Sequence, residues 1–264
     1  MIKIAICNAK GGSGKSATST SLAAYLAIQG KKTLLVDANP QANSSRLLLR
    51  LDFLEAAPEP TLYDVLYSFL ERKQNIIEEA IRSVEHNKNL FLLPATLQLE
   101  RMKTNVTINS RRPVEVFKNL FKPLGEKFDY LILDCPADLS IYVENSLEIA
   151  DYVLCTSTYA RQSVEGVAQA IPLVWEIKGD DFTKIKVLMT KVKASATVIQ
   201  RKLAEYIGEL REAGYMLEMT IPEEQAVENA DMDNAVIMFN PAYRRSKARK
   251  AYEQFGAWVL KNWT

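Results

Sequence analysis

Short hydrophobic runs alternate along this chain with longer stretches of helical spacing. The runs are almost continuously apolar, which is typical of strands buried on both faces of a sheet. Helical spacing follows several of them, for example over Ala17–Gln29 and from Leu62 to Leu70. This alternation predicts an α/β fold, a mostly parallel twisted sheet with helices on both faces and ligands at the carboxyl ends of the strands. We expect strands at Ile2–Cys7, Thr33–Val36, Leu90–Leu93, Tyr130–Leu133, Tyr152–Cys155, Ile185–Met189 and, with a weaker pattern, Met216–Met219.

The chain shows neither a Gly/Ser-rich linker nor an internal repeat, so we expect residues 1–264 to form a single domain. Irregular stretches at residues 55–60 and 103–112 predict surface loops within it. No apolar run reaches the roughly 18–20 residues of a membrane span, and no hydrophobic leader opens the chain, which favours a cytoplasmic protein. With 48% hydrophobic and 25% charged residues, disorder and fibrous structure are excluded.

Cysteine and histidine contribute little candidate chemistry. Cys7, Cys135 and Cys155 lie in or beside apolar runs without the spacing of a metal or redox motif, which predicts buried free thiols. His86 is the only histidine and lies in a polar stretch. A zinc site and a Ser-His-Asp triad are therefore not expected.

The strongest chemical signal follows the first expected strand. Asn8-Ala9-Lys10-Gly11-Gly12-Ser13-Gly14-Lys15-Ser16 leads directly into a helical segment. Glycines allow backbone N–H groups to turn towards an anion, and the positive end of a helix dipole adds to the attraction. The usual phosphate loop reads Gly-x-x-x-x-Gly-Lys-[Ser/Thr], and this chain matches it from Gly14 onward, with Ala9 at the first Gly position.

The segment from Lys10 to Ser16 resembles the deviant Walker A box of the partition and positioning ATPases, the ParA, Soj and MinD group. The resemblance continues in Lys32-Thr33-Leu34-Leu35-Val36-Asp37-Ala38-Asn39-Pro40-Gln41 and in Phe128-Asp129-Tyr130-Leu131-Ile132-Leu133-Asp134-Cys135-Pro136. Weaker matches at Leu93-Pro94-Ala95, Glu165-Gly166 and Ile221-Pro222 extend it over nearly the whole chain. The resemblance implies a P-loop ATPase fold with ATP and Mg²⁺ as cofactors.

The resemblance also implies roles for individual residues. Lys15 would bind the β- and γ-phosphates, Lys10 would reach the nucleotide of a partner subunit in an ATP-bound homodimer, and Asp134 would hold a Mg²⁺-bound water. The candidate catalytic residues are Lys10, Lys15, Asp37 and Asn39, and the candidate metal-site residues are Ser16, Asp37 and Asp134. The candidate ATP-binding residues are Lys10, Gly11, Gly12, Ser13, Gly14, Lys15, Ser16, Ala17, Thr190, Lys191 and Pro222.

Position 39 departs from the family pattern, which is usually Asp-x-Asp-Pro-Gln. Asn39 can hydrogen-bond a water but cannot take its proton, so hydrolysis should be slower by about 10²–10⁴ while ATP binding persists. Three explanations stay open. The protein is a naturally slow ATPase, Asp37 substitutes, or Asn39 is an engineered trap of the ATP-bound state. The intact pattern around position 39 favours the trap.

Although the net charge is only +1, basic residues gather in the second half of the chain. Residues 184–204 hold six Lys or Arg and no acid, and residues 244–250 hold five. Such clusters indicate contact with a phosphate backbone, which a homodimer would double. With the resemblance to Soj, this predicts non-specific DNA binding near the nucleoid, reversed when a ParB-like or other cargo-bound activator triggers hydrolysis. The candidate DNA-binding residues are Lys193, Arg201, Arg244, Arg245, Lys247, Arg249 and Lys250.

Two other functions compete with this DNA-positioning switch. The terminal helix carries Ala248, Tyr252, Phe255 and Val259 on one face, which suits either packing onto the sheet or a MinD-like membrane-surface helix. We expect packing, and membrane binding is the alternative. A metabolic or iron–sulfur P-loop enzyme would need paired cysteines that the spacing does not offer. Because the first expected strand begins at Ile2, we also do not expect the N-terminal DNA-reading domain of larger partition proteins.

Overall fold

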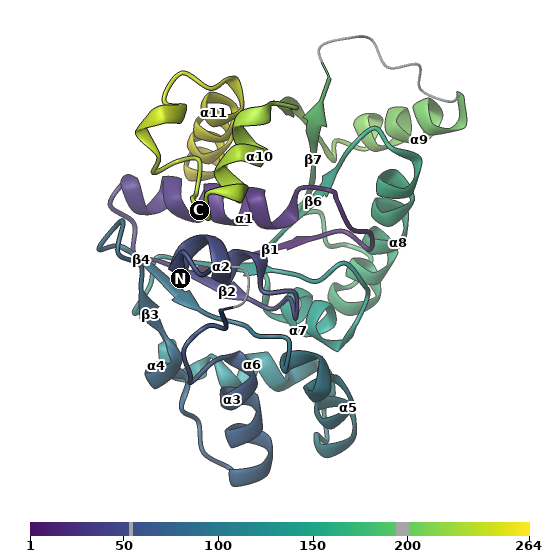
Figure 1. Ribbon diagram of the computed structural model, residues 1–264. Helices are drawn as coiled ribbons and strands as arrows, with labels where there is room; N and C mark the ends of the chain where they lie inside the picture. Colours follow the sequence, from purple (N-terminus) through teal and green to yellow (C-terminus); the bar gives the residue numbers. More distant parts are fainter. Residues whose placement is uncertain (53–54, 194–200) are drawn as a thin grey trace.

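A mostly parallel sheet of eight strands forms the centre of the structure (Figure 1). The computed structural model describes residues 1–52, 55–193 and 201–264, apart from the side chains of residues 201 and 202. Along the sheet the strands are ordered β3-β4-β2-β5-β1-β6-β7-β8, and only the β3–β4 pair is antiparallel. The strands are β1 (Ile2–Cys7), β2 (Thr33–Asp37), β3 (Arg82–Ser83), β4 (Leu90–Leu93), β5 (Tyr130–Asp134), β6 (Tyr152–Ser157), β7 (Ile185–Val192) and β8 (Met216–Pro222).

All seven strands expected from the hydrophobic runs are present, which confirms the predicted α/β fold. Five of them extend past the expected end, because a strand continues into polar residues such as Asp37, Asp134 and Ser157 once its apolar stretch is buried. The antiparallel edge strand β3 was not predicted. It is only two residues long and contains no apolar run to mark it.

Helices cover both faces of the sheet (Figure 1). One face carries α1 (Lys15–Ile28), α2 (Asn43–Leu49), α10 (Gln225–Met232) and α11 (Lys247–Asn262). The other carries α3 (Leu62–Tyr67), α4 (Ile77–Ala80), α5 (Leu99–Asn109), α6 (Val116–Leu120), α7 (Ile141–Ile149) and α8 (Arg161–Lys178), while α9 (Arg201–Glu212) adds Leu210 to the same core.

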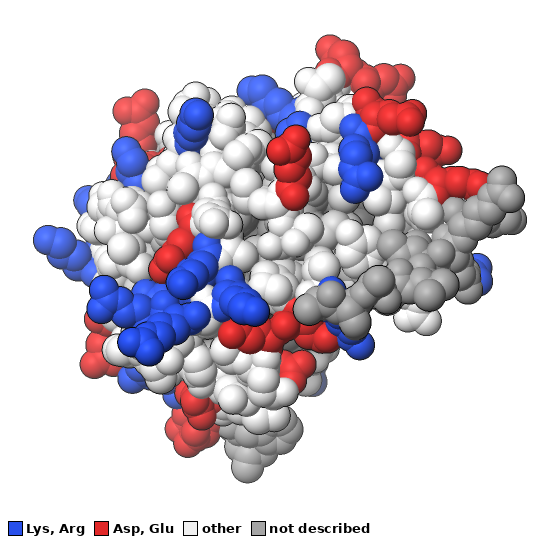
Figure 2. Space-filling model, turned by 90° about the horizontal axis from the view of Figure 1, so that it is seen from above, with Lys and Arg blue, Asp and Glu red and all other residues white. Residues whose placement is uncertain are grey.

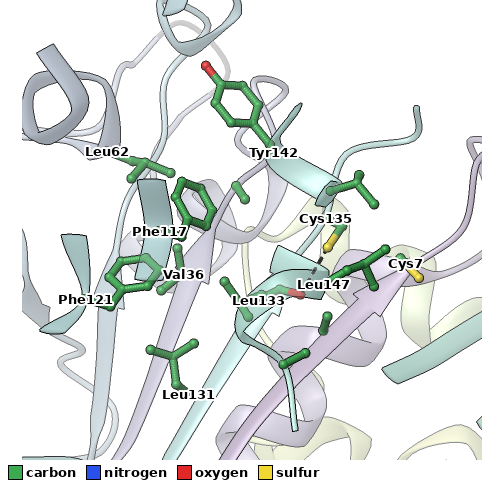
Figure 3. Close-up of a cluster of buried hydrophobic side chains, with 14 of the residues drawn as sticks. Cys7, Val36, Leu62, Phe117, Phe121, Leu131, Leu133, Cys135, Tyr142 and Leu147 are labelled. Carbon is green, nitrogen blue, oxygen red and sulfur yellow. Dashed lines mark hydrogen bonds between the residues drawn. The ribbon is translucent and has the colours of Figure 1, made fainter. Parts of the chain in front are cut away.

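Alternate residues of each strand feed two separate hydrophobic cores. In β1, Ala5 and Cys7 face the core under α7 and α8, whereas Ile4 and Ile6 face the core under α1 and α11. Figure 3 shows part of the first core, where side chains of β2 and β5 meet aromatic residues of the covering helices, and where Cys7 and Cys135 lie. The three thiols Cys7, Cys135 and Cys155 are free and buried, which confirms the prediction for them.

The loop expected at residues 103–112 is wrong over most of its length, because α5 continues to Asn109. Leu99, Met102 and Val106 form a narrow buried stripe on α5. Apart from the exposed Ile108, the outer face is polar, so the segment lacks the wide apolar face by which a helix is recognised in sequence. The loop expected at residues 55–60 is confirmed for these residues.

The C-terminal helix α11 packs onto the sheet through its apolar face. Ala248, Tyr252, Phe255 and Val259 are each at most 2% exposed. Beyond the helix, the indole of Trp263 stacks on the ring of Tyr152, with 4.9 Å between ring centroids. This face is therefore part of the protein core and is not available to a lipid surface. In the part of the chain that the structure describes, no helix is both long and apolar enough to cross a membrane.

Close packing of α11 on α1 depends on Gly256, which gives the first testable prediction. A Cβ at this position would overlap the ring of Tyr25 on α1. We expect Gly256→Ala to lower the free energy of unfolding by about 1–3 kcal/mol, the usual cost of overpacking, measured by chemical denaturation. Gly208→Ala on α9 is the matched control, since its Cβ would meet no atom within 4 Å and a helical alanine stabilises by roughly 0.5–1 kcal/mol. Equal stability of the two variants would contradict the prediction.

Candidate nucleotide-binding site

The glycine-rich loop joins β1 to α1 at the carboxyl edge of the sheet. Gly12 and Gly14 have φ angles of +75° and +80°, which L-residues with a side chain rarely adopt. A Cβ on Gly14 would also lie 3.0 Å from Oγ1 of Thr190 on β7. Helix α1 begins without a side-chain cap and without an acidic residue in its first turn. Its first backbone N–H groups are thus left for an external anion, which is how a phosphate loop binds phosphate.

Lys15 spans this loop from the inside. Its ammonium Nζ donates hydrogen bonds to the carbonyl oxygens of Lys10 at 2.9 Å and Asn8 at 3.3 Å. Burial lowers the pKa of Lys15 from its ordinary value, and the nearby carboxylate of Asp134 opposes this shift. Lys15 is only 6% exposed, so its charge faces the loop and not the solvent. This is the cation that the sequence predicts for the β- and γ-phosphates.

Two buried carboxylates stand side by side at the ends of β2 and β5, where Asp37 and Asp134 are register partners. Asp134 accepts hydrogen bonds from the hydroxyls of Ser44 at 2.6 Å and Ser19 at 3.1 Å. Burial raises its pKa, and hydrogen bonds from the hydroxyls of Ser44, Ser16 and Ser19 work against that rise. The hydroxyl of Ser16 at the start of α1 and the carboxylate of Asp134 at the end of β5 therefore lie near each other. Such oxygen ligands suit Mg²⁺ directly or through a water.

Asp37 is fully buried, and hydrogen bonds engage both of its oxygens. Oδ1 accepts from the backbone N of Asn39 at 3.1 Å, and Oδ2 accepts from the backbone N and the hydroxyl of Ser45 at 2.8 and 2.7 Å. Burial, followed by the charge of Asp134, raises the pKa of Asp37 to about 7. Asp37 does not line the cavity described below. Its contacts hold the turn that follows β2.

Asn39 lies at the edge of the site and is 7% exposed. Its side-chain Oδ1 accepts a hydrogen bond from the backbone N of Gln41 at 3.0 Å, and its own backbone N bonds to Asp37. The residue lines the cavity, together with Pro40 and Gln41. The side-chain oxygen of Asn39 is thus already used by the turn. The oxygen keeps a second lone pair and the NH₂ group is a donor, so the side chain can hydrogen-bond a water but cannot take its proton.

A cavity of about 500 Å³ opens in front of the loop. Of the candidate ATP-binding residues, all line it except Lys10, and they come from the loop, β7 and the end of β8. Another part of the lining is partly apolar and comes from α10, the segment after it and α11, with Val227, Ile237 and Tyr252. The cavity thus has a charged end for phosphates and a partly apolar end for a base.

Comparison with known proteins identifies the family. A family model described as an AAA domain matches residues 1–188. Soj of Bacillus subtilis is 29% identical over 263 residues, covering 98% of each chain. The chromosome partitioning protein ParA of Myxococcus xanthus is 28% identical, covering 98% of this chain and 87% of that one.

The chain belongs to the ParA/Soj/MinD family of P-loop ATPases.

Solved structures share the fold. An ATP complex of a Cyanothece McdA variant has a TM-score of 0.79 at 24% identity, covering 99% of this chain and 96% of that one. A cobyrinic acid a,c-diamide synthase from Mycobacterium smegmatis with bound ADP and magnesium has a TM-score of 0.76 at 23% identity, covering 100% and 96%. This ParA/Soj/MinD-type chain therefore shares its fold with an ATP-bound protein and with a protein bound to ADP and magnesium.

In this ParA/Soj/MinD-type chain, sequence reasoning missed residues that complete the site. Lys103 on α5 lines the cavity, and its Nζ lies 2.8 Å from carboxylate oxygens of Asp138 and Glu100. Ser44 and Ser45 hold the two buried carboxylates. The two serines begin three residues after the end of the Asn39-Pro40-Gln41 motif, so this pair of small hydroxyl residues was an available signal. Lys103 had none, because it reaches Asp138 only through the packing of α5 beside the loop after β5.

The basic cluster of residues 244–250 surrounds the start of α11. Arg244, Arg245, Lys247 and Lys250 are exposed. The guanidinium of Arg249 is already hydrogen-bonded within the chain. It donates to the carboxylate of Glu253 on α11 at 3.1 Å and to the carbonyl of Asn240 at 3.2 Å. In Figure 2 a contiguous group of Lys and Arg lies on the left of the upper face, the half where α11 lies in Figure 1.

The two other candidate DNA-binding residues are not part of residues 244–250. Lys193 is exposed, with its ammonium 3.9 Å from a carboxylate oxygen of Glu223. The side chain of Arg201 lies outside the described residues.

Proposed function

We propose that this chain is an ATP-dependent switch that positions DNA or a DNA-bound cargo in the cytoplasm. ATP binding forms a homodimer that binds DNA without sequence preference on the nucleoid, and hydrolysis stimulated by a ParB-like or other cargo-bound activator releases it. The observation that carries the proposal is a direct link between the nucleotide cavity and the basic cluster. Glu224 lines the cavity, and its carboxylate accepts hydrogen bonds from the hydroxyl of Ser246 at 2.6 Å and the backbone N of Ala248 at 2.7 Å.

This contact ties the cavity wall to the start of α11, where the basic residues lie. The negative charge of Glu224 also offsets part of the positive charge of Lys247. Desolvation raises the pKa of Glu224, but the hydrogen bonds and the charge of Lys247 outweigh it, so the pKa is lowered. A ligand that moves the cavity-lining segment after Pro222 therefore also moves residues 246–248 at the start of α11. ATP binding and DNA affinity are coupled through one carboxylate.

The residues present suit ATP and Mg²⁺. Lys15 and the open amides of α1 would hold the phosphates, and Ser16 with Asp134 would hold the metal ion. When bound, Mg²⁺ neutralises charge on the phosphate oxygens. Lys10 does not line its own cavity, which leaves its ammonium free to act on the nucleotide of a second subunit. That second charge would make ATP part of the dimer interface.

We propose slow intrinsic hydrolysis because no proton acceptor from Asp37–Gln41 faces the cavity. Asn39 offers an amide there, and the carboxylate of Asp37 is sequestered behind it by Ser45. Asp37 then serves as a positioning residue for the turn and not as the base that takes a proton from water. Long-lived ATP dimers follow from this arrangement, and with them long residence on DNA.

Removal of the exposed cations tests the DNA-binding step. We expect the triple substitution Arg244→Gln, Arg245→Gln and Lys250→Gln to reduce the slope of log K against log salt by about 2–3 per protomer, because each phosphate contact contributes roughly 0.9. The measurement is fluorescence anisotropy with a short duplex of arbitrary sequence, with ATP or with ADP, between 50 and 200 mM salt, a range in which such binding changes by about 10³–10⁵.

The matched control removes the same charge elsewhere, with Lys31→Gln, Lys32→Gln and Lys122→Gln, all exposed residues outside the cluster. A control that weakens binding equally would show that only net charge matters and would remove the cluster from the proposal. Binding that is the same with ADP and ATP would contradict the switch. Sedimentation with anionic liposomes in place of DNA would favour the MinD-like alternative, although the apolar face of α11 is buried.

A further inference from the structure

The side chain of Asn8, which follows β1, joins three segments at the base of the phosphate loop. Its Nδ2 donates to the carbonyl of Thr156 at the end of β6, at 2.7 Å, and to the carbonyl of Ser163 in the first turn of α8, at 2.9 Å. Its Oδ1 accepts from the backbone N of Lys10 at 2.8 Å. Asn8 is 1% exposed, so all of these bonds are shielded from water. Bonds to a buried amide of this kind are costly to break singly.

Helix α8 approaches this amide closely because position 166 has no side chain. A Cβ on Gly166 would overlap Oδ1 of Asn8 and would lie 3.0 Å from Cγ of Lys10. The position is helical and has no unusual φ angle, so glycine is not needed there for its backbone conformation. In a helix interior glycine destabilises by about 0.5–1 kcal/mol relative to alanine. Close contact with the loop is the physical reason for a glycine at this position.

Further hydrogen bonds fix the start of α8 relative to β6. The hydroxyl of Ser163 accepts from the backbone N of Thr158 at 2.9 Å and lies 3.2 Å from the hydroxyl of Ser157. Asn8 is therefore attached to a rigid corner and not to a free helix end. Oδ1 of Asn8 links the backbone N of Lys10 to that corner. The surface of α8 at Gly166 limits the positions that the side chain of Lys10 can take.

We propose that Asn8 and Gly166 are positioning residues that set the direction of Lys10. Asn8 fixes the backbone of Lys10, and the absence of a side chain at Gly166 leaves the space in which the first methylenes of Lys10 lie. The inference rests on the proposed role of Lys10 at the nucleotide of a second subunit. The three atoms nearest to a Cβ at position 166 belong to Asn8 and Lys10 and none to Gly11–Ser16, so we expect Lys10 to be affected more than the nucleotide cradle of the same chain.

Gly166→Ala tests the proposal by separating two ligand-dependent properties. We expect the affinity for a fluorescent ADP analogue to change less than about threefold, and ATP-induced dimerisation, measured by analytical ultracentrifugation, to weaken on the order of 10²-fold, the scale on which loss of one partner of an interfacial charge pair weakens association. Two glycine controls accompany it. Gly208→Ala should behave as the unchanged chain, and Gly256→Ala should lose stability but keep ATP-induced dimerisation.

A double-mutant cycle keeps the test decisive if Gly166→Ala folds poorly. Asn8→Ala removes the Oδ1 that the new Cβ would overlap but leaves its 3.0 Å approach to Cγ of Lys10, so adding Gly166→Ala to Asn8→Ala should impair dimerisation by much less than the roughly 10²-fold expected in the unchanged chain. Additive effects would overturn the proposal. So would a parallel loss of ADP affinity and dimerisation, because position 166 would then hold the whole loop. Failure of the unchanged chain to dimerise with ATP would instead contradict the proposed function, whatever the variants do.

Discussion

Exchange of Asn39 for Asp should raise the single-turnover rate of ATP hydrolysis by about 10²–10⁴, the range that a positioned general base contributes. In the structure one oxygen at this position accepts a hydrogen bond from the backbone N of Gln41. An aspartate would keep that bond and add a second oxygen that can accept a proton. The measurement is a single turnover of labelled ATP by Asn39→Asp and by the unchanged chain, each with DNA present.

Asp37→Asn is the control that separates the two candidate bases. If Asp37 substitutes for the missing group, this change abolishes the residual hydrolysis and Asn39→Asp has little effect. The structure favours the opposite result, because both oxygens of Asp37 are bonded to Ser45 and Asn39 and neither faces the cavity. Asp37→Asn is then expected to destabilise the turn after β2, while Asn39→Asp gains activity. Equal rates for Asn39→Asp and the unchanged chain would remove position 39 from the mechanism.

The sheet was predictable because its strands are buried on both faces, so each appears as an uninterrupted apolar run. Strand β1 is an example, since Ile4, Ile6 and Ala5 are all fully buried although they face two different cores. The same logic fails at the margins of the fold. Strand β3 pairs through its backbone alone, and α5 buries only a narrow stripe, so neither shows the pattern by which its type is recognised.

The phosphate end of the site was predictable because its parts are contiguous in the chain, from Lys10 to Ser16. Parts that meet only through tertiary packing were not. Lys103 reaches Asp138 from another helix, and Gly166 reaches Asn8 from α8. The sequence of a helix does not show which atom a glycine or a lysine in that helix will face. For the same reason the sequence could group the cations of residues 244–250 but could not show that Arg249 is already paired with Glu253.

Replacement of Lys15 by Met should weaken ATP binding by on the order of 10²–10⁴-fold, since two charge-assisted hydrogen bonds contribute about 1.5–3 kcal/mol each and 1.4 kcal/mol corresponds to tenfold in affinity. Methionine retains the unbranched stem of the lysine, so the change isolates the ammonium, which bridges the carbonyls of Asn8 and Lys10. Isothermal titration with ATP and with ADP measures the loss.

Lys178→Met is the matched control for this loss. Lys178 is also a partly buried lysine with a pKa lowered by desolvation, and its ammonium likewise donates to a backbone carbonyl, that of Glu148, at 2.9 Å. It lies at the end of α8 and does not line the cavity. Both variants lose a buried ammonium and its carbonyl bond, so both should lose some stability. Only Lys15→Met should lose ATP affinity, and if the two variants lose it equally, the effect comes from destabilisation and the phosphate role of Lys15 is wrong.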